Sequence, residues 1–126
     1  MIRKHIYSIE YVYNKLKTVD FNSRQKQLIN FDNEFIKGAS QRYAVFMHDS
    51  CVCVKCGLKA AYFALERFED QKTYHLNLYG LKDNKEILFT KDHIIPKSKG
   101  GKNRLDNYQT MCCICNELKA DNLENI

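Results

Sequence analysis

An Asp-His pair near the start of the segment KDHIIPKSKGG, residues 91–101, combines a possible base with a possible metal ligand, two groups that can serve phosphodiester hydrolysis. An imidazole has an ordinary pKa of about 6.5, so His93 can accept a proton from water at neutral pH. Asp92 offers a hard oxygen ligand to a divalent cation. These residue types alone do not separate a catalytic hairpin from a basic loop, because an isolated histidine is more often structural.

A second oxygen ligand is available in the segment MCCICNELK, residues 111–119, where Asn116 lies in the first turn of an expected helix. A carboxylate, a carboxamide and water suit Mg²⁺ or Mn²⁺, whereas a histidine in place of the carboxamide would favour softer ions. Basic residues in and after the loop can line the path of a phosphate backbone. These are Lys97, Lys99, Lys102, Arg104 and Lys119.

Two C-x-x-C pairs predict a tetrahedral structural zinc site. The first is Cys53 with Cys56, followed by Gly57, and the second is Cys112 with Cys115 at the start of the last helix. A two-residue spacer lets one tight turn bring two thiolates to one ion, and glycine tolerates the left-handed backbone that follows. Unrelated buried thiols and a redox motif are the weaker interpretations, because the pairs match each other and no βαβ pattern surrounds them.

The bulk composition of the 126-residue chain is that of one globular domain. In the reducing compartment that we expect for it, closely paired cysteines more often bind metal than form disulfides. The two remaining cysteines, Cys51 and Cys113, are expected to be buried and not to bind the metal. No apolar run approaches the roughly 18–20 residues that span a membrane, and no secretory signal is visible. We therefore expect a cytoplasmic protein. A net charge of +5 agrees with a polyanionic partner without establishing one.

The elements that must position these side chains follow from the hydrophobic pattern. Alternating residues predict two or three antiparallel strands across 60–91, with the sequence KDN at 82–84 as a turn. The chain then continues as a loop at 96–104 and a returning strand at 107–111. Helices are expected at 5–17, 40–50 and 113–122.

These elements predict an α+β fold in which a hairpin and a helix lie on the zinc site, next to an antiparallel sheet and N-terminal helical segments. Residues 1–50 are expected to form a helical extension packed on a core of residues 51–126. The two parts together are expected to make one compact domain.

In order and spacing, the segments DHIIPKSKGG, NRLDNYQTMC and CICNELK resemble the HNH endonuclease family. The segment CVKCG extends the likeness upstream to Cys53, and Gly100 with Gly101 matches the glycine pair of the family. SQRYAVFMHDSCVCVKCG and YHLNLYG are also similar to segments of small HNH proteins encoded by bacteriophages. The resemblance implies a ββα-metal fold beside a Cys₄ zinc site.

The resemblance also implies roles for four residues. His93 matches the general base and Asp92 the metal-binding carboxylate. Asn107 matches the central Asn, which in the family is mainly structural and keeps the base histidine oriented. Asn116 stands where the family usually has a histidine, which makes this the HNN variant, in which a carboxamide oxygen can still hold Mg²⁺.

The function implied is that of a metal-dependent DNA endonuclease with structural Zn²⁺, using His93 and one Mg²⁺ to leave 5′-phosphate and 3′-hydroxyl ends. The alternative is a non-catalytic zinc-binding module that holds nucleic acid or a protein. The intact set of Asp92, His93, Asn107 and Asn116 favours the enzyme. Double-stranded DNA is expected on the resemblance alone, the chain is expected to be a monomer or a homodimer, and a phage-encoded protein would act in the host-cell cytoplasm.

Overall fold

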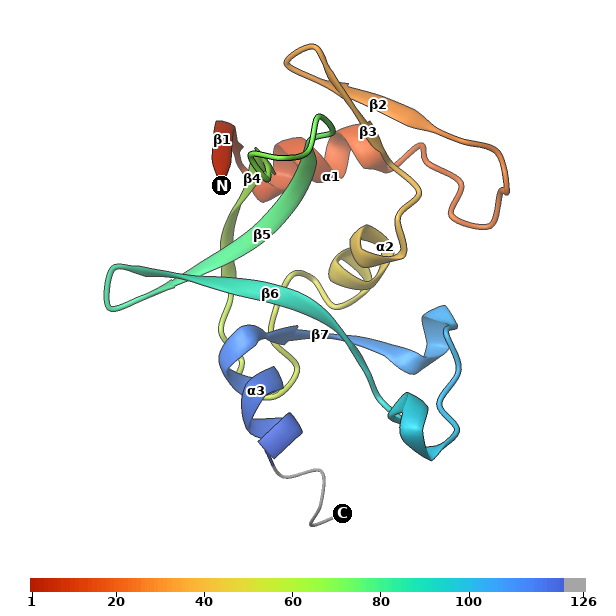
Figure 1. Cartoon of the computed structure of the whole chain (residues 1–126), viewed down its shortest axis with the longest axis vertical. Coiled ribbons are helices and arrows are strands. Elements are labelled where there is room, and N and C mark those ends of the chain that lie inside the picture. Colours follow the sequence, from red (N-terminus) through yellow and green to blue (C-terminus); the bar gives the residue numbers. More distant parts are fainter. Residues whose placement is uncertain (122–126) are drawn as a thin grey trace.

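The computed structural model describes residues 1–121 and shows an α+β fold built on a five-stranded antiparallel sheet of order β1-β4-β5-β6-β7 (Figure 1). The strands of this sheet are β1 (Ile2–Tyr7), β4 (Ala60–Arg67), β5 (His75–Lys82), β6 (Lys85–His93) and β7 (Tyr108–Cys112). The other elements are α1 (Ile9–Leu16), the hairpin of β2 (Leu28–Phe31) and β3 (Glu34–Lys37), α2 (Gln41–His48), two 3-10 turns, η1 (Lys97–Lys99) and η2 (Leu105–Asn107), and α3 (Cys113–Asp121). The predicted fold class is confirmed.

The period-2 alternation seen in the sequence decides which side of the central strands is buried. Leu65 and Leu76 are paired residues of β4 and β5, and both are fully buried. Successive side chains of a strand point to opposite faces, so the neighbouring pair, Glu66 and His75, lies on the other face. The apolar face meets α1, α2 and the β2–β3 hairpin in one core, to which these elements contribute Val12, Leu16, Phe31, Ile36, Tyr43 and Phe46.

The N-terminal extension contains strands as well as helices. The helix expected at 5–17 begins at Ile9, where the side chain of Ser8 accepts a hydrogen bond from the backbone N–H of Tyr11 at 3.1 Å. Residues before it form β1, which pairs with β4 and becomes the edge of the sheet. The second expected helix is present as α2, directly after Ser40.

Two tight turns have the positive backbone angles of two-residue hairpins. The turn predicted at 82–84 joins β5 to β6, with φ of 53° at Asp83 and 63° at Asn84. The same dipeptide type, Asp32 with Asn33, joins β2 to β3 at φ of 50° and 68°. Asp and Asn tolerate this left-handed conformation better than most residues.

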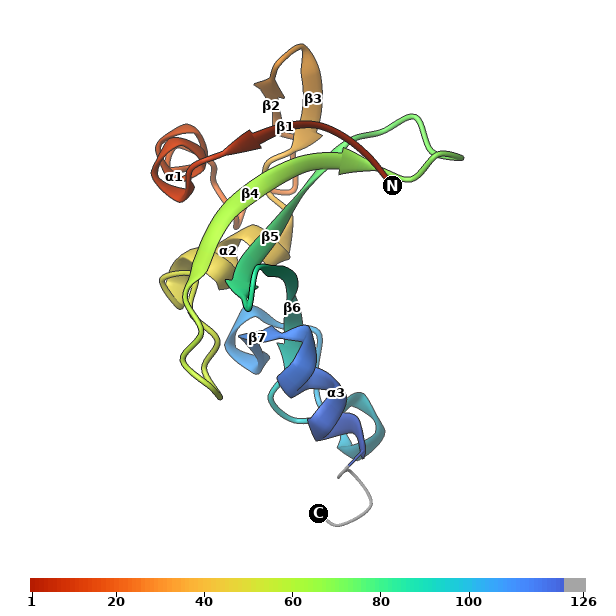
Figure 2. The ribbon, with the colours of Figure 1, turned by 90° about the vertical axis from the view of Figure 1, so that its left-hand side faces the viewer.

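The elements spread along the long axis of the molecule (Figures 1 and 2). The β2–β3 hairpin and α1 lie at one end, and the loop between β6 and β7 lies with α3 at the other. Helix α2 lies between them and packs on β6 and β7. No helix among residues 1–121 is long and apolar enough to cross a membrane.

Candidate active site

The candidate active site stands on β6, β7 and α3. The two strands pair from Phe89 opposite Cys112 to His93 opposite Tyr108, and α3 follows β7 without a break and packs back on both strands. The predicted order of strand, loop, strand and helix is present, and it places Asp92, His93 and Asn116 beside one another around a small pocket of about 90 Å³.

Asp92 is held by two donors on one of its carboxylate oxygens. It is 8% exposed, and its Oδ2 accepts hydrogen bonds from Gln109 Nε2 at 3.0 Å and from Lys119 Nζ at 2.7 Å. The ammonium of Lys119 also donates to the backbone carbonyl of His93. Within residues 1–121 no hydrogen bond to Asp92 Oδ1 is recorded, so this oxygen is the one left to bind a cation.

Asn116 is oriented by a chain of hydrogen bonds between β6 and β7. Its Nδ2 donates to Thr90 Oγ1 at 2.8 Å, and that hydroxyl donates to the backbone carbonyl of Met111 at 2.8 Å. Because the amide nitrogen is hydrogen-bonded to Thr90, the carboxamide oxygen of Asn116 is the atom that could bind a cation. One carboxylate oxygen and one carboxamide oxygen, with water filling the other positions, fit the oxygen coordination of Mg²⁺ or Mn²⁺.

His93 is fixed by a ring contact and a hydrogen bond. Its ring meets that of Tyr108 edge-on, with centroids 4.9 Å apart, and its Nε2 lies 2.9 Å from Asn103 Oδ1. Because a carboxamide oxygen only accepts hydrogen bonds, Nε2 carries the proton of the neutral ring and Nδ1 keeps the lone pair. The sequence analysis did not single out Asn103, since a polar residue in a loop has no spacing that marks it.

Asn107 closes the loop between the strands. It is buried, its Oδ1 accepts from the backbone N–H of Ile95 at 2.9 Å, and its Nδ2 donates to the carbonyls of Ile95 and Lys102 at 3.1 and 2.9 Å. These contacts fit a structural role for the central Asn. In this structure, however, the side chain that bonds to the His93 ring is Asn103.

The two C-x-x-C pairs come together where β7 ends and α3 begins. The sulfur atoms of Cys53, Cys56, Cys112 and Cys115 all lie within 4.8 Å of one another, a cluster that could hold a metal such as zinc. Tetrahedral zinc with bonds of about 2.3 Å would put the sulfur atoms about 3.8 Å apart, and those of Cys56 and Cys112 are 3.9 Å apart. The two other cysteines, Cys51 and Cys113, lie outside the cluster.

The thiols of this cluster differ in how readily they ionise. Burial raises the pKa of Cys53, but hydrogen bonds from backbone N–H groups, that of Cys56 first, outweigh burial and lower it to about 6. Burial, and then the neighbouring thiols, raises the pKa of Cys115. A cation would supply the positive charge that four adjacent thiolates need.

The basic residues predicted to contact nucleic acid fall into two groups. Lys97, Lys99 and Lys102 are exposed on the loop, and Arg104 forms an exposed ion pair with Asp106 at 3.4 Å. Lys119 instead lies in the pocket against Asp92. The loop therefore places its basic side chains at the surface, whereas Lys119 lies beside the carboxylate of Asp92.

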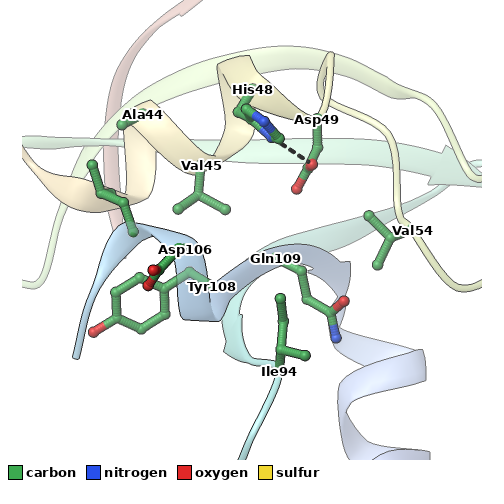
Figure 3. Close-up of a pocket in the computed structure, with 10 residues that line it drawn as sticks. Ala44, Val45, His48, Asp49, Val54, Ile94, Asp106, Tyr108 and Gln109 are labelled. Atoms are coloured by element: carbon green, nitrogen blue, oxygen red, sulfur yellow. Dashed lines mark hydrogen bonds and ion pairs between the residues drawn. The ribbon is translucent and has the colours of Figure 1, made fainter. Parts of the chain in front are cut away.

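A larger pocket of about 480 Å³ lies beside the pair of strands β6 and β7, between α2 and the end of β6 (Figure 3). Val45, Val54 and Ile94 line it, and the hydrogen-bonded side chains of His48 and Asp49 stand at its rim. The lining is mostly apolar, and the predicted site residues Asp92, His93 and Asn116 line the smaller pocket instead.

The comparisons with known proteins agree with this geometry. A family model described as HNH endonuclease matches residues 79–125, which covers β6, the loop, β7 and α3. The predicted HNH resemblance is confirmed. Neither the curated proteins nor the solved structures gave a match to the chain. The HNH segment thus includes Asp92, His93, Asn107 and Asn116, while Cys53 and Cys56 lie upstream of it.

Proposed function

We propose that the protein is a metal-dependent DNA endonuclease, in which the HNH segment hydrolyses phosphodiester bonds to 5′-phosphate and 3′-hydroxyl ends. The observation that carries the proposal is the convergence of Asp92, Asn116 and His93 on one pocket beside an exposed basic loop. Each of the three side chains is held by a hydrogen bond with another residue, accepted by Asp92 and donated by Asn116 and His93, which is the preorganisation that a catalytic site requires.

The side chains divide the work of hydrolysis. Asp92 and Asn116 would hold one Mg²⁺ or Mn²⁺ through oxygen atoms. When bound, this cation would supply positive charge to the phosphate and the departing 3′ oxygen. His93 would take a proton from water through Nδ1 while Asn103 holds its Nε2–H. Lysines of the loop would hold the neighbouring phosphates.

The cysteine cluster has a different task in this proposal. Zn²⁺ bound to Cys53, Cys56, Cys112 and Cys115 would connect two segments of the chain. It would join residues 53–56, which follow α2, to the first turn of α3, the helix that carries Asn116. A structural zinc of this kind supplies about 10–16 kcal/mol of apparent binding free energy. The zinc therefore supports the geometry of the catalytic pocket without taking part in the reaction.

The substrate and the setting follow from the family rather than from a contact in the structure. The HNH match supports nucleic acid as the substrate, and we propose double-stranded DNA, cut by a monomer or a homodimer in the cytoplasm. That cytoplasm would be the host cell's if the protein is encoded by a phage. A non-catalytic module that only binds nucleic acid or a protein is the alternative.

Relaxation and linearisation of a supercoiled plasmid in Mg²⁺ would separate the two. Removing a general base costs roughly 10²–10⁴-fold in rate, so His93→Ala should all but stop cutting. His48→Ala is the matched control, because this exposed histidine lies outside the pocket of Asp92 and should cut like the wild type. Equal cutting by the His93 variant would contradict the mechanism. Binding without cutting by the wild type, in Mg²⁺ and in Mn²⁺, would favour the non-catalytic module.

A further inference from the structure

A cleft lined by basic residues lies outside the HNH segment, where the end of β3, the start of α2 and the loop before β5 meet. It has a volume of about 510 Å³, and its lining includes Lys37, Arg42, Lys72 and His75. Among residues 1–121, no aspartate or glutamate lines it. Lys37 and Lys72 are exposed, and Tyr74 supplies an aromatic wall. The cleft therefore presents positive charge without a carboxylate of its own.

The charge of Arg42 is not neutralised within the described part of the chain. Its Nη2 donates to two uncharged acceptors, the carbonyl of Leu76 at 3.2 Å and Asn77 Oδ1 at 3.0 Å, and no ion pair to a carboxylate is recorded for it there. The nearby carboxylate of Glu66 is buried and already accepts from Arg3 at 2.6 Å. Burial, followed by the proximity of Arg42, lowers the pKa of His75, as expected where cations gather.

Lys91 connects this cleft to the candidate active site. It stands two residues before His93 on β6, so both side chains belong to the same face of the strand. Lys91 Nζ lies 4.1 Å from the centroid of the Tyr108 ring, the same ring that His93 contacts. Burial and then Arg42 lower the pKa of Lys91, which places Arg42 within electrostatic reach of the hairpin. Figure 1 shows α2, the helix of Arg42, between β7 and the β2–β3 hairpin.

We propose that Lys91, Arg42, Lys37 and Lys72 form a second phosphate-binding surface, which holds the backbone of the nucleic acid whose scissile phosphate lies at His93. This surface rests on the proposed function for its substrate, and it gives the N-terminal part of the chain a role in binding. Because the contacts go to phosphates, they add affinity without sequence preference. A duplex must extend beyond β6, β7 and the loop between them to make these phosphate contacts.

Salt-dependent binding to duplex DNA tests the surface without any need for cleavage. The protein would be the full chain with zinc, carrying His93→Ala so that the probe stays intact. Fluorescence anisotropy would compare a duplex of about 30 base pairs with one of about 10, a single helical turn. The test variant is Lys37→Gln with Lys72→Gln. Its charge-matched control is Lys82→Gln with Lys85→Gln, at the turn between β5 and β6.

The expected result is a smaller salt slope for the test variant alone. Two lost phosphate contacts should reduce the slope of log K against log salt by about 1.8, since each contributes roughly 0.9. Affinity for the longer duplex should fall by about tenfold at moderate salt, with the short duplex unaffected. Arg42→Gln should lower the slope further, with an unchanged melting curve required of every variant.

An unchanged slope, an equal loss in the control pair, or no binding of duplex DNA by the parent protein would each overturn the surface. Plasmid cutting by the wild type, together with an unchanged slope, would leave the proposed nuclease standing and remove only the second surface. A reduced slope in a protein whose wild type does not cut would support the surface and reject the nuclease.

Discussion

At the scale of single residues, the site is defined as much by the side chains that hold its members as by the members themselves. Gln109 and Lys119 occupy one oxygen of Asp92, and Thr90 occupies the amide nitrogen of Asn116. What remains is one oxygen on each, both suited to a hard cation. Such supporting partners commonly tune metal affinity by 10–100-fold. These hydrogen bonds therefore leave two oxygen atoms for the cation of the proposed mechanism.

Asn103 is the residue on which the orientation of the base depends. Asn103→Ala removes the acceptor of His93 Nε2, which leaves the ring free to turn and to protonate either nitrogen. We expect plasmid cutting to slow by about 10–100-fold, within the range that general-base catalysis contributes, while duplex binding stays the same. Asn103→Asp keeps an acceptor oxygen in place and should recover most of the rate. Equal rates for the wild type and the alanine variant would show that Tyr108 alone holds the ring.

The sequence indicated three residues that line the candidate pocket, but not the side chains that hold them. Asp92, His93 and Asn116 stand in a short, ordered pattern, whereas Asn103 and Thr90 are common polar residues whose roles arise only once the loop and β7 are in place. Lys119 shows the same limit. The sequence analysis grouped Lys119 with the basic residues that can line the path of a phosphate backbone, and the structure places it against Asp92.

At the scale of elements, the glycine pair of the loop contains two different constraints. Gly100 has φ of 88°, a left-handed angle, with open space where a Cβ would be. At Gly101 a Cβ would lie 1.7 Å from the carbonyl oxygen of Ile95, which is an impossible contact. The carbonyl belongs to the residue that Asn107 ties into the loop. The close approach of Gly101 to Ile95 is thus part of the packing that closes the loop between β6 and β7.

Alanine at each glycine should separate the two constraints. Gly101→Ala must push the backbone of Ile95 away, so we expect a loss of cutting by more than tenfold and a destabilisation of about 2–3 kcal/mol, as for an overpacked site. Gly100→Ala only strains one backbone angle and should cost about 1 kcal/mol. Urea unfolding and plasmid assays on both variants would test the order. A larger effect at Gly100 would contradict it.

The four-cysteine cluster is the feature whose loss should affect the fold most widely. Cys112→Ser weakens a site formed by two segments 56 residues apart in the chain, so we expect less bound zinc and a strongly lowered melting temperature, because metal binding is part of the folding free energy. Zinc content measured by a colorimetric chelator, together with thermal unfolding, would check both. Cys113→Ser is the matched control, since Cys113 is adjacent to Cys112 in the chain but its own thiol lies outside the cluster. Equal zinc in the two variants would reject the four-cysteine site.

The elements nearest the HNH segment were predicted well, and those of the N-terminus less so. Strands β4 to β6 alternate clearly, and the turn signal at 82–84 sets their order. β1 is short and polar, with exposed residues from Arg3 to Ile6, so its sequence pattern does not predict a strand. These residues form a strand because they pair with β4. The sequence does contain a signal for the β2–β3 hairpin, the Asp32-Asn33 dipeptide, which our sequence-based prediction did not include.

At the scale of the whole molecule, the N-terminal part is joined to the rest by a shared core and by one buried polar network. Glu66 is 3% exposed and accepts from Arg3, Asn77 and Tyr79 at 2.6 to 2.8 Å. Burial and the bond to Glu66 raise the pKa of Tyr79 to about 12, so the phenol stays protonated and keeps donating. Arg3 is the cation of this network, and it comes from β1, the first strand of the chain.

Removing that cation should destabilise the whole fold rather than one end of it. Arg3→Leu leaves the carboxylate of Glu66 buried with only neutral donors. Breaking a fully buried pair costs about 3–5 kcal/mol, and Arg3 is 30% exposed, so we expect about 2 kcal/mol here. For a domain of this size, that lowers the melting temperature by roughly 8 °C.

A double variant at Arg3 and Glu66 distinguishes the cost of an unpaired buried charge from the cost of a lost packing contact. Glu66→Gln in the Arg3→Leu background removes the unpaired charge but keeps an oxygen for Asn77 and Tyr79, so it should recover at least half of the lost stability. A double variant no more stable than Arg3→Leu alone would mean that packing of the arginine stem, rather than its charge, joins β1 to the sheet. Because β1 also completes the sheet that carries β6, recovery of plasmid cutting should follow recovery of the melting temperature in the same proteins.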